Sequence, residues 1–247
     1  MKAVILAGGR GTRLAPYTAV LPKPLVPIGN IPILEVIIRQ LITSGFTSVT
    51  LTLGHLGELI RAYFAAQKNL SRRIEIQYVD EEQPTGTAGS LKSVTDLPET
   101  FLVMNGDVLT TIDYQALINY HHASGACLTI AGHQKAVNID LGVLRLRDNE
   151  VVDYIEKPRY VYPVSMGIYV YDRRALEHIP AGQHFDFPEL VLKLIANQQK
   201  VVCFESDVLW LDIGRREDYA EAQEVFEKNQ NLFRLGDEPP QSPANPG

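Results

Sequence analysis

Cysteine is scarce in this chain of 247 residues, which contains only 2 cysteines. Cys127 and Cys203 lie in separate apolar stretches, and neither belongs to a Cys-x-x-Cys pair or a Cys/His cluster. Their positions exclude the usual zinc-ligand patterns. Because free cysteine is among the most buried residue types, we expect both thiols to be reduced, buried and structural.

An excess of positive charge is also missing. The chain has 23 Lys and Arg against 29 Asp and Glu, a formal net charge of -6 and no basic run, which argues against a nucleic-acid or anionic-membrane partner. The apolar run Ala3–Ala7 is too short for a signal-peptide core, and no later stretch approaches the roughly 20 apolar residues that span a bilayer. We therefore expect a cytoplasmic protein in which the functional positive charges are local.

Apolar residues make up 45% of the chain, which is enough to form the core of one large α/β domain. Up to about Ala131, strand-like apolar segments alternate with helix-like segments, which predicts a mostly parallel central sheet with helices on both faces. This is a Rossmann-like three-layer sandwich. We expect strands at 3–7, 49–53, 74–79 and 101–104, and helices at 32–45, at 56–64 and from Thr87 onward.

The chain becomes richer in strands after Gly125. A turn at Asp148 and Asn149 predicts a hairpin between two of them. The segment 236–247 contains four prolines and almost no apolar residues, so we expect it to be disordered. We expect strands at 126–131, 141–146, 151–155, 165–171, 201–204 and 208–213, and helices at 187–197 and 215–228.

A glycine-rich loop follows the first expected strand. Gly8, Gly9 and Gly11 have no Cβ atoms, so their backbone N–H groups can turn towards an anion, most naturally a polyphosphate. Arg13 and Lys23 supply positive charge downstream. The loop does not match GxxxxGK[ST], and the GxGxxG pattern that starts at Gly9 has a leucine in place of its last glycine. A bare glycine-rich loop is most often only a turn.

Polar residues gather where the expected strands end, which is where ligands bind in such folds. Loops 8–13, 81–89 and 105–107 follow the first, third and fourth strands. Asp107 follows the fourth expected strand after a glycine, Gly106, and Asp212 lies near the end of a late expected strand. A single aspartate of this kind is usually a cap or a turn former, but carboxylate oxygens also suit Mg²⁺ that is bound together with phosphates.

The extended pattern GGRGTRL at 8–14, followed by PYTAVLPKPLVPI at 16–28, resembles the N-terminal signature of the sugar-phosphate nucleotidyltransferases, also called nucleotide-sugar pyrophosphorylases. The likeness continues to about Phe226 through NGD at 105–107, EKP at 156–158 and WLDIG at 210–214. It implies one domain over 1–230, with a nucleotide-binding part at 1–131 and a sugar-binding part at 132–230. It also implies an enzyme that combines a nucleoside triphosphate with a sugar 1-phosphate and releases pyrophosphate.

The resemblance also implies roles for individual residues. It makes Arg13, Lys23 and Asp107 catalytic, and Asp107 and Asp212 ligands of Mg²⁺. The implied sugar-phosphate residues are Gly142, Glu156, Lys157, Ser165 and Gly167. The implied nucleotide-binding residues are Leu6, Ala7, Gly8, Gly9, Gly11, Thr12, Arg13, Lys23, Glu81, Gln83, Gly86, Thr87 and Asp107.

The loop at 81–89 bears on the choice of base. Its GTAG sequence at 86–89 is similar to that of guanylyltransferases that act on mannose or heptose 1-phosphates, although it also occurs with other bases. Glu81 or Glu82 could accept the two adjacent N–H groups of guanine, whereas Gln83 would suit a pyrimidine. We favour GTP and leave UTP or dTTP open. Ser165 stands where the family commonly has asparagine, which opens the sugar site to a heptose.

Two other readings stay open. The first is a catalytically inactive relative that binds a nucleotide sugar and regulates a partner. The joint presence of the implied cations and aspartates argues against this interpretation. The second is a glycosyltransferase, but such enzymes usually carry a DxD motif, and Asp107 is followed by Val108 and Leu109. The expected partners are the two substrates, with a homodimer possible.

Overall fold

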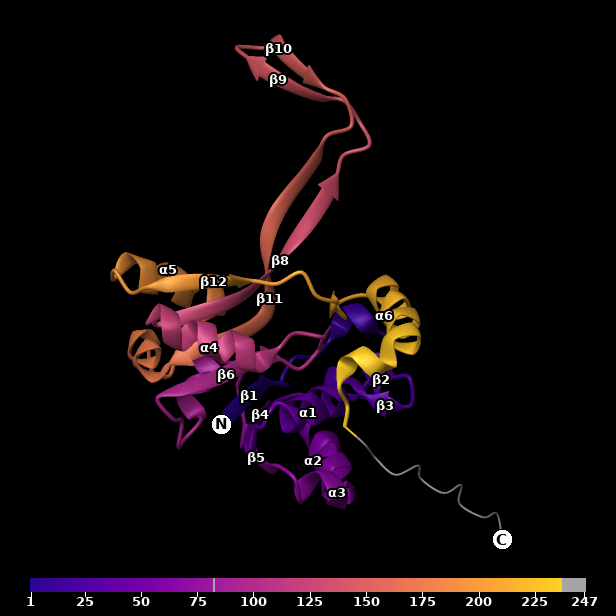
Figure 1. Cartoon of the computed structure of the whole chain (residues 1–247), viewed down its shortest axis with the longest axis vertical. Coiled ribbons are helices and arrows are strands. Elements are labelled where there is room, and N and C mark those ends of the chain that lie inside the picture. The colour runs from indigo at the N-terminus through magenta and orange to yellow at the C-terminus, as the bar shows by residue number, and fades with distance from the viewer. Residues whose placement is uncertain (82, 237–247) are drawn as a thin grey trace.

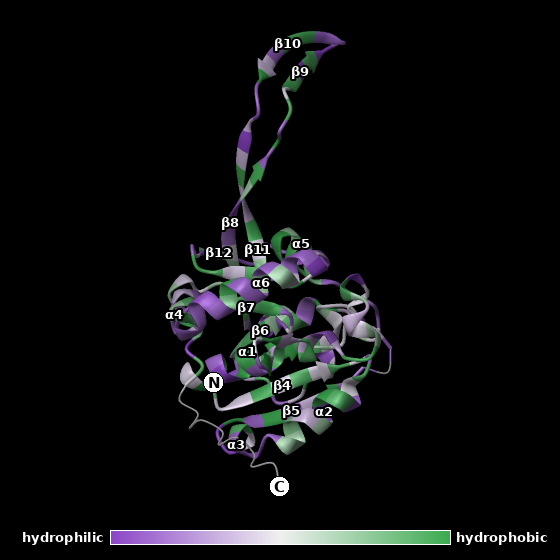
Figure 2. Ribbon diagram, turned by 90° about the vertical axis from the view of Figure 1, so that its right-hand side faces the viewer, coloured by the Kyte–Doolittle hydropathy of each residue, from purple (hydrophilic) through white to green (hydrophobic). Residues whose placement is uncertain are grey.

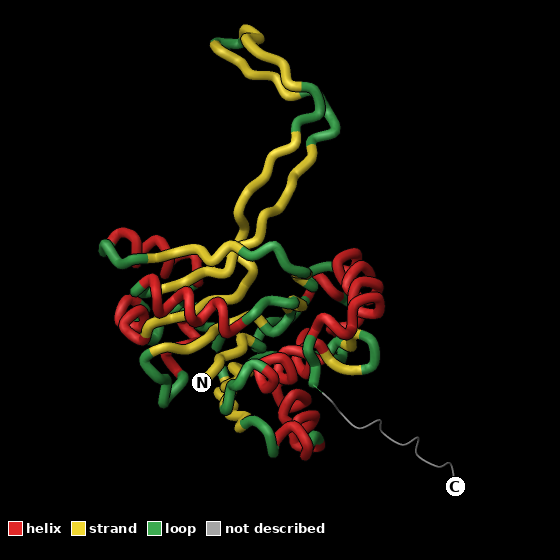
Figure 3. The backbone as a smooth tube through the Cα atoms, in the orientation of Figure 1, coloured by secondary structure: helices red, strands yellow, loops and turns green. Residues whose placement is uncertain are grey.

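A computed structural model describes residues 1–81 and 83–236. Its centre is a seven-stranded sheet in the order β12-β8-β11-β6-β1-β4-β5 (Figures 1 and 3). β11 runs antiparallel to β6 and β8, and all other neighbours are parallel, so the predicted mostly parallel sheet is confirmed. The strands are β1 (Lys2–Leu6), β4 (Ser48–Leu53), β5 (Glu75–Asp80), β6 (Thr100–Asn105), β8 (Leu128–Asn138), β11 (Arg159–Asp172) and β12 (Val201–Glu205).

Apolar cores lie on both faces of this sheet. Alternate side chains of β1 enter different cores: Ala3 and Ile5 join the first, and Val4 joins the second. The first core is covered by helices α1, α2, α4 and α6, and the second by α5. The α/β sandwich thus has three layers. The helices are α1 (Ile33–Thr43), α2 (Gly57–Ala66), α3 (Lys68–Ser71), α4 (Tyr114–Ser124), α5 (Phe187–Ala196) and α6 (Arg216–Asn229).

Local sequence signals set the ends of α4. The Asp113 side chain accepts hydrogen bonds from the backbone N–H groups of Gln115 and Ala116, at 2.9 and 3.0 Å, and so caps the first turn. The helix stops at Gly125, which has a φ of 60° that favours glycine. Among the described residues, no helix combines the length and the apolarity that crossing a membrane requires.

The helix expected to begin near Thr87 is present only as a short 3-10 helix, not as an α-helix. Residues Gly89–Ser93 form a 3-10 helix, and the preceding segment is a loop. The N–H groups of Ala88 and Gly89 both donate to the carbonyl oxygen of Phe185, at 3.0 and 2.9 Å. Contacts with a distant part of the chain therefore decide the conformation of this segment, and its own sequence does not report them.

Three further expectations differ from the structure or lie outside it. Cys127 is buried, but Cys203 is exposed, because it lies on β12, the outermost strand of the sheet. The strand expected at 208–213 is confined to β13 (Trp210–Asp212), which pairs with β7 (Val108–Thr110) rather than with the main sheet. A second short pair of strands outside the main sheet is formed by β2 (Pro27–Ile28) and β3 (Ile31–Pro32). The prediction of a disordered tail falls, from 237 onward, outside the described residues.

A long two-stranded arm projects from the sandwich (Figures 1 and 2). It is formed by the outer parts of β8 and β11 and ends in a hairpin of β9 (Val143–Arg147) and β10 (Glu150–Ile155). Asp148 and Asn149 make the turn, both with positive φ, as their sequence predicts. The division into nucleotide- and sugar-binding parts at residue 131 stays a prediction.

Candidate active site

Glycines shape the loop that follows β1. Gly8 packs directly on Gly54, where an added Cβ would lie 2.6 Å from the carbonyl oxygen of Gly8. Gly11 has a φ of 62°, and the Thr18 hydroxyl donates to its carbonyl oxygen at 2.8 Å. The loop thus needs its glycines for close approach and for positive φ. Its backbone amides lie where an anion could reach them.

Lys23 and Asp107 form an ion pair beside this loop. Lys23 is buried, and its ammonium donates to Oδ2 of Asp107. Gly106 positions the aspartate, because its N–H donates to the carbonyl oxygen of Leu6 at 3.0 Å. The other carboxylate oxygen, Oδ1, is buried and has no hydrogen-bond partner among the described residues. A buried oxygen of this kind is stabilised by a bound cation or donor.

Asp212 lies next to Asp107. β13 pairs with β7 so that Asp212 is opposite Val108, and the N–H of Ile213 donates to the carbonyl oxygen of Asp107 at 3.2 Å. Burial raises the pKa of Asp212, and the charge of Asp107 raises it further, while Lys23 lowers it. Two neighbouring carboxylates of like charge favour binding of a divalent cation between them. These hard oxygen donors, with the orphaned Oδ1 of Asp107, fit such an ion.

Arg13 belongs to the same electrostatic centre. It lies on a 3-10 helix, Thr12–Leu14, and its side chain is exposed. It lines an open hollow together with Asp212, Arg215 and Asp218. Its positive charge lowers the pKa of Asp212. The guanidinium is therefore near enough to the two aspartates to act on a ligand bound there.

A first cavity of about 310 Å³ opens over the glycine loop. The Glu81 carboxylate lies beside Gly8, where an added Cβ would be 3.6 Å from Oε2. Burial raises the pKa of Glu81. The cavity thus combines an anion-binding loop with a half-desolvated hydrogen-bond acceptor. The predicted nucleotide-binding residues in its lining are Leu6, Gly8, Gly9, Glu81, Gly86, Thr87 and Asp107.

The other predicted nucleotide-binding residues take varied positions. Ala7 and Lys23 line a small hollow of about 60 Å³ that Asp107 shares. Gly11 packs on the aliphatic part of Lys23, and Thr12 faces a separate hollow. Gln83 is exposed and does not line the first cavity. Glu82 lies outside the described residues.

The loop at 84–88 is fastened to the start of α5. Asp186 accepts hydrogen bonds from the backbone N–H and the hydroxyl of Thr87, at 2.9 and 3.1 Å. Gly86 has a φ of 83°, and an added Cβ would lie 2.6 Å from the carbonyl oxygen of Phe185. Residues almost a hundred positions away therefore hold this side of the cavity in place.

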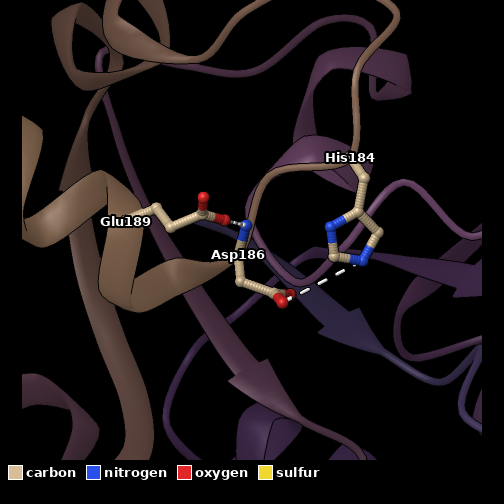
Figure 4. A group of neighbouring side chains, drawn as sticks. All are labelled: His184, Asp186 and Glu189. Carbon is tan, nitrogen blue, oxygen red and sulfur yellow. Dashed lines mark hydrogen bonds and ion pairs between the residues drawn. The ribbon is translucent and has the colours of Figure 1, made fainter.

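His184, Asp186 and Glu189 form a cluster at this point (Figure 4). The Glu189 carboxylate accepts a hydrogen bond from the backbone N–H of Asp186 at 2.7 Å, which begins α5. Asp186 is bound to Thr87, and His184 faces Asp186 at 3.9 Å. Both carboxylates are thus occupied with holding the loop and the helix, and His184 and Asp186 line the first cavity.

A second cavity, of about 580 Å³, adjoins the first. Thr87 and Asn105 line both cavities, and Asp212 lines the second. The predicted sugar residues Ser165 and Gly167 also line it. Gly167 has a φ of 73°, and an added Cβ would lie 2.7 Å from the side-chain nitrogen of Asn105, so only glycine fits there.

The remaining predicted sugar residues are not brought to this cavity. Gly142, Glu156 and Lys157 lie at the base of the hairpin at the end of the arm. Tyr154 joins two of them: its hydroxyl donates to Glu156 at 3.0 Å, and its ring occupies the space that a side chain on Gly142 would need. Lys157 has a φ of 43° and is exposed. The three form a group of their own, apart from the cavity.

Sequence reasoning did not assign Asn105, His184 or Asp186 to the site. Asn105 carried a signal, since it directly precedes Gly106 and Asp107 at the end of an expected strand. His184 and Asp186 carried none, because their place in the first cavity depends on contacts with Thr87 and Gly86. A helix-capping aspartate looks the same in sequence whether or not a loop is tied to it.

With this geometry in view, the chain can be compared with known proteins. Residues 2–229 match the family described as nucleotidyl transferase, and the chain belongs to that family. It is 32% identical over 230 residues to D-glycero-alpha-D-manno-heptose 1-phosphate guanylyltransferase of Aneurinibacillus thermoaerophilus, covering 92% of this chain and 99% of that one. It is also 32% identical over 243 residues to UTP–glucose-1-phosphate uridylyltransferase of Synechocystis, covering 90% of this chain.

The chain spans 62% of the length of that Synechocystis protein, and likewise of the Mycobacterium tuberculosis mannose-1-phosphate guanylyltransferase. Among solved structures, HddC from Yersinia pseudotuberculosis superposes with a TM-score of 0.71 at 28% identity, over 91% of this chain and 99% of the other. The same protein complexed with GMP-PN gives a TM-score of 0.69 at 27% identity. The fold and the family model thus agree that the chain is a member of the nucleotidyl transferase family.

Proposed function

We propose that the chain transfers a guanylyl group from GTP to a 1-phosphate of a mannose or manno-heptose type, giving a GDP-sugar and pyrophosphate. One observation carries this proposal. Two cavities share Thr87 and Asn105, and Asp107 lines the first while Asp212 lines the second. This arrangement suits an enzyme that brings a nucleotide and a second phosphorylated substrate together at two carboxylates.

In the proposed reaction, an oxygen of the sugar 1-phosphate attacks the α-phosphorus of the triphosphate. The bond between that phosphorus and the oxygen bridging to the β-phosphate breaks, and pyrophosphate leaves with the electron pair. The second pKa of a phosphate monoester is about 6, so the nucleophile is already ionised at neutral pH and no general base is needed. The protein has to align two polyanions and neutralise the leaving group.

We assign the residues to these two tasks by their charge. Arg13 and Lys23 are assigned to the triphosphate, whose phosphates would lie on the amides of Gly8, Gly9 and Gly11. Asp107 and Asp212 would hold a Mg²⁺ ion, which supplies charge neutralisation for neighbouring phosphates when it is bound. Lys157 and Glu156, whose roles follow from the family resemblance, are assigned to the phosphate and the hydroxyls of the sugar.

The base and sugar assignments rest on two side chains. Glu81 presents a half-desolvated carboxylate to the first cavity, which suits the two adjacent N–H donors of guanine. Ser165 lines the second cavity and has a short side chain, which leaves room for a heptose. The uridylyltransferase of Synechocystis is as similar as the heptose guanylyltransferase, so UTP is the competing nucleotide.

The test is pyrophosphate release with Mg²⁺ over a matrix of substrates. GTP, UTP, dTTP, CTP and ATP would each be paired with mannose, glucose, N-acetylglucosamine and manno-heptose 1-phosphates. We expect release with GTP and with a mannose- or heptose-type acceptor. Preference for UTP or dTTP would overturn the base assignment. No release with any pair, from a folded protein that binds nucleotide, would favour a regulatory role for the chain.

A further inference from the structure

The arm is anchored in the sheet only at its root. β12 pairs with β8 no further than Gly132, and β6 pairs with β11 only from Ile168 onward. Between these limits and the hairpin, β8 and β11 pair with each other, from Ser165 opposite Gly132 to Arg159 opposite Asn138. This part of the arm is therefore a two-stranded ribbon in unbroken register, which Figure 3 shows standing clear of the sandwich.

The ribbon separates the arm residues from their own cavity. Ser165 lines the second cavity, and Arg159 lies six residues further out along β11. Six residues of strand span about 20 Å. Glu156 and Lys157 lie beyond Arg159, so neither can reach the cavity of its own chain unless the ribbon unpairs. Bending the hairpin back does not help, because both residues are at its base.

The hairpin presents an apolar face to solvent. Leu144 pairs with Tyr154, and Leu146 with Val151, so that these four side chains share one face. Their exposed fractions are 51%, 59%, 56% and 59% in that order. The opposite face is polar towards the tip, where Arg145 and Asp153 form an ion pair, and carries the pair Val143 and Ile155 at its base. An isolated two-stranded hairpin is marginally stable in water, so this face is expected to pack against something.

The sandwich offers a matching surface. The second cavity is lined by aromatic and aliphatic side chains, including Phe187, Val191 and Leu192 of α5, and Leu192 is 68% exposed. Among the described residues of its lining, the only charged one is Asp212. Arg13, Lys135 and Arg215 line a neighbouring hollow that shares Trp210 and Asp212 with this cavity. No described cation lines the second cavity itself, on the α5 side, and the exposed ammonium of Lys157 on the arm has the charge that suits a phosphate monoester bound there.

We infer that two copies of this chain exchange arms. In this arrangement the β9–β10 hairpin of one copy lays its apolar face on the α5 side of the other copy's cavity, and its base brings Glu156 and Lys157 to the sugar phosphate bound there. The same contact repeats in the opposite direction, as a two-fold interface requires. The inference rests on the proposed function, since that function gives the arm residues a substrate to bind.

Each alternative occupant leaves an observation unexplained. Docking in the same copy would require the register of the ribbon to be broken. An unrelated partner would cover the hairpin but would leave Glu156 and Lys157 away from the second cavity, whose own described lining contains no cation. A second copy satisfies both the hairpin and the cavity, because every copy has one of each.

Complementation between two inactive variants tests the inference. Asp107→Asn disables the sandwich and keeps the arm, whereas Lys157→Asn disables the arm and keeps the sandwich. Asparagine tolerates the positive φ at position 157. Each variant alone should release little pyrophosphate. After mixing in equal amounts and allowing exchange, half of the dimers are mixed and each has one complete site, so about a quarter of wild-type turnover should return.

The possible outcomes separate the two proposals. If wild-type protein is active and Lys157→Asn is inactive, but the mixture gains nothing, the arm acts within its own chain and the inference fails. Unchanged turnover of Lys157→Asn would also overturn it. A wild-type protein that is silent with every substrate pair would contradict the proposed function, and the exchange of arms would then be judged by molecular mass.

Light scattering of the full chain measures its molecular mass in solution. We expect a dimer for the wild type and a monomer for the double variant Leu144→Glu/Leu146→Glu. Both side chains are exposed within the chain, so these changes leave its own core intact. The matched control is Arg145→Gln, on the polar face of the same strand, which should stay dimeric. A wild-type monomer, or a dimer that the double variant keeps, would overturn the inference.

Discussion

Lys23 is ion-paired with one oxygen of the Asp107 carboxylate, and the other oxygen is buried without a partner among the described residues. The two residues are 84 positions apart in the sequence and meet where the glycine loop passes the end of β6. The pair holds the carboxylate in one orientation before any ligand arrives. The free oxygen is thereby left available for a metal ion, with little reorganisation on binding.

Asp107→Asn should lower turnover on the order of 10³-fold and remove its dependence on Mg²⁺, because the carboxylate charge is lost. Pyrophosphate release measured against Mg²⁺ concentration checks this. Asp96→Asn is the control: Asp96 is exposed, precedes the opposite end of β6 and has a positive φ that asparagine tolerates. A normal Mg²⁺ response in Asp107→Asn would remove Asp107 from the site.

Arg13→Ala should lower turnover on the order of 10³-fold, since the arginine would neutralise charge on the triphosphate in the transition state. Single-turnover measurements at saturating nucleotide would separate this loss from weaker binding. Arg10→Ala is the matched control, because Arg10 is an exposed arginine of the same loop that lines a different hollow. Near wild-type turnover in Arg13→Ala would show that the assignment is wrong.

Glu81→Gln should stabilise the protein at neutral pH and weaken its use of GTP. Burial raises the pKa of Glu81 above its ordinary value of 4.5, so the folded state holds the proton more tightly than the unfolded state does. Ionisation therefore removes stability as the pH rises from about 4.5 through the raised pKa, and the loss is constant above it. Thermal unfolding should thus show a higher Tm for Glu81→Gln at pH 7.5, with the difference vanishing below about pH 4.5.

The same variant tests the choice of base. Loss of a charged acceptor for guanine should lower kcat/KM for GTP by roughly tenfold to a hundredfold. Glu58→Gln, at an exposed position in the first turn of α2 where Glu58 pairs with Arg61, should cost no more than about 0.5 kcal/mol and leave nucleotide use unchanged. If Glu81→Gln used GTP as well as the wild type does, the carboxylate would not read the base.

Asp186→Ala should raise the KM for the nucleotide, because the loop at 84–88 loses the two hydrogen bonds through which Asp186 holds Thr87. The expected cost in stability is about 1 kcal/mol. Asp113→Ala is a close control, since Asp113 also accepts two hydrogen bonds but caps α4 away from the cavities. It should cost a similar amount, about 1 kcal/mol, with no change in KM. Equal KM values in both variants would contradict a positioning role for Asp186.

The sequence predicted those parts of the fold and the site that depend on local pattern. The apolar run of β1, the glycines after it and the turn at Asp148 and Asn149 each have a signal within a few residues, and the structure has the corresponding strand, loop and hairpin. The approach of Asp107 to Asp212 was expected for another reason: the family resemblance makes both of them ligands of one metal ion.

Features that depend on distant contacts could not be predicted in this way. The segment after Thr87 has a helix-like pattern, but hydrogen bonds to Phe185 and Asp186 hold its first residues in a turn, and only a short 3-10 helix, Gly89–Ser93, follows. The exposure of Cys203 depends on β12 being the outermost strand, which its own apolar sequence does not indicate. The arm is a similar case: the residues of β8 and β11 predict strands, but only the pairing of their neighbours shows where the sheet ends and the ribbon begins.

The bond between Thr87 and Asp186 also bears on the order in which the molecule assembles. The two residues are 99 positions apart, so a growing chain makes the whole glycine loop long before it makes the residue that fixes the loop at 84–88. Contacts of such long sequence separation form late and slowly, because a large loop must be closed first. A fragment that ends near residue 131 would therefore contain the glycine loop and Asp107, but its loop at 84–88 would lack the hydrogen bonds to Phe185 and Asp186.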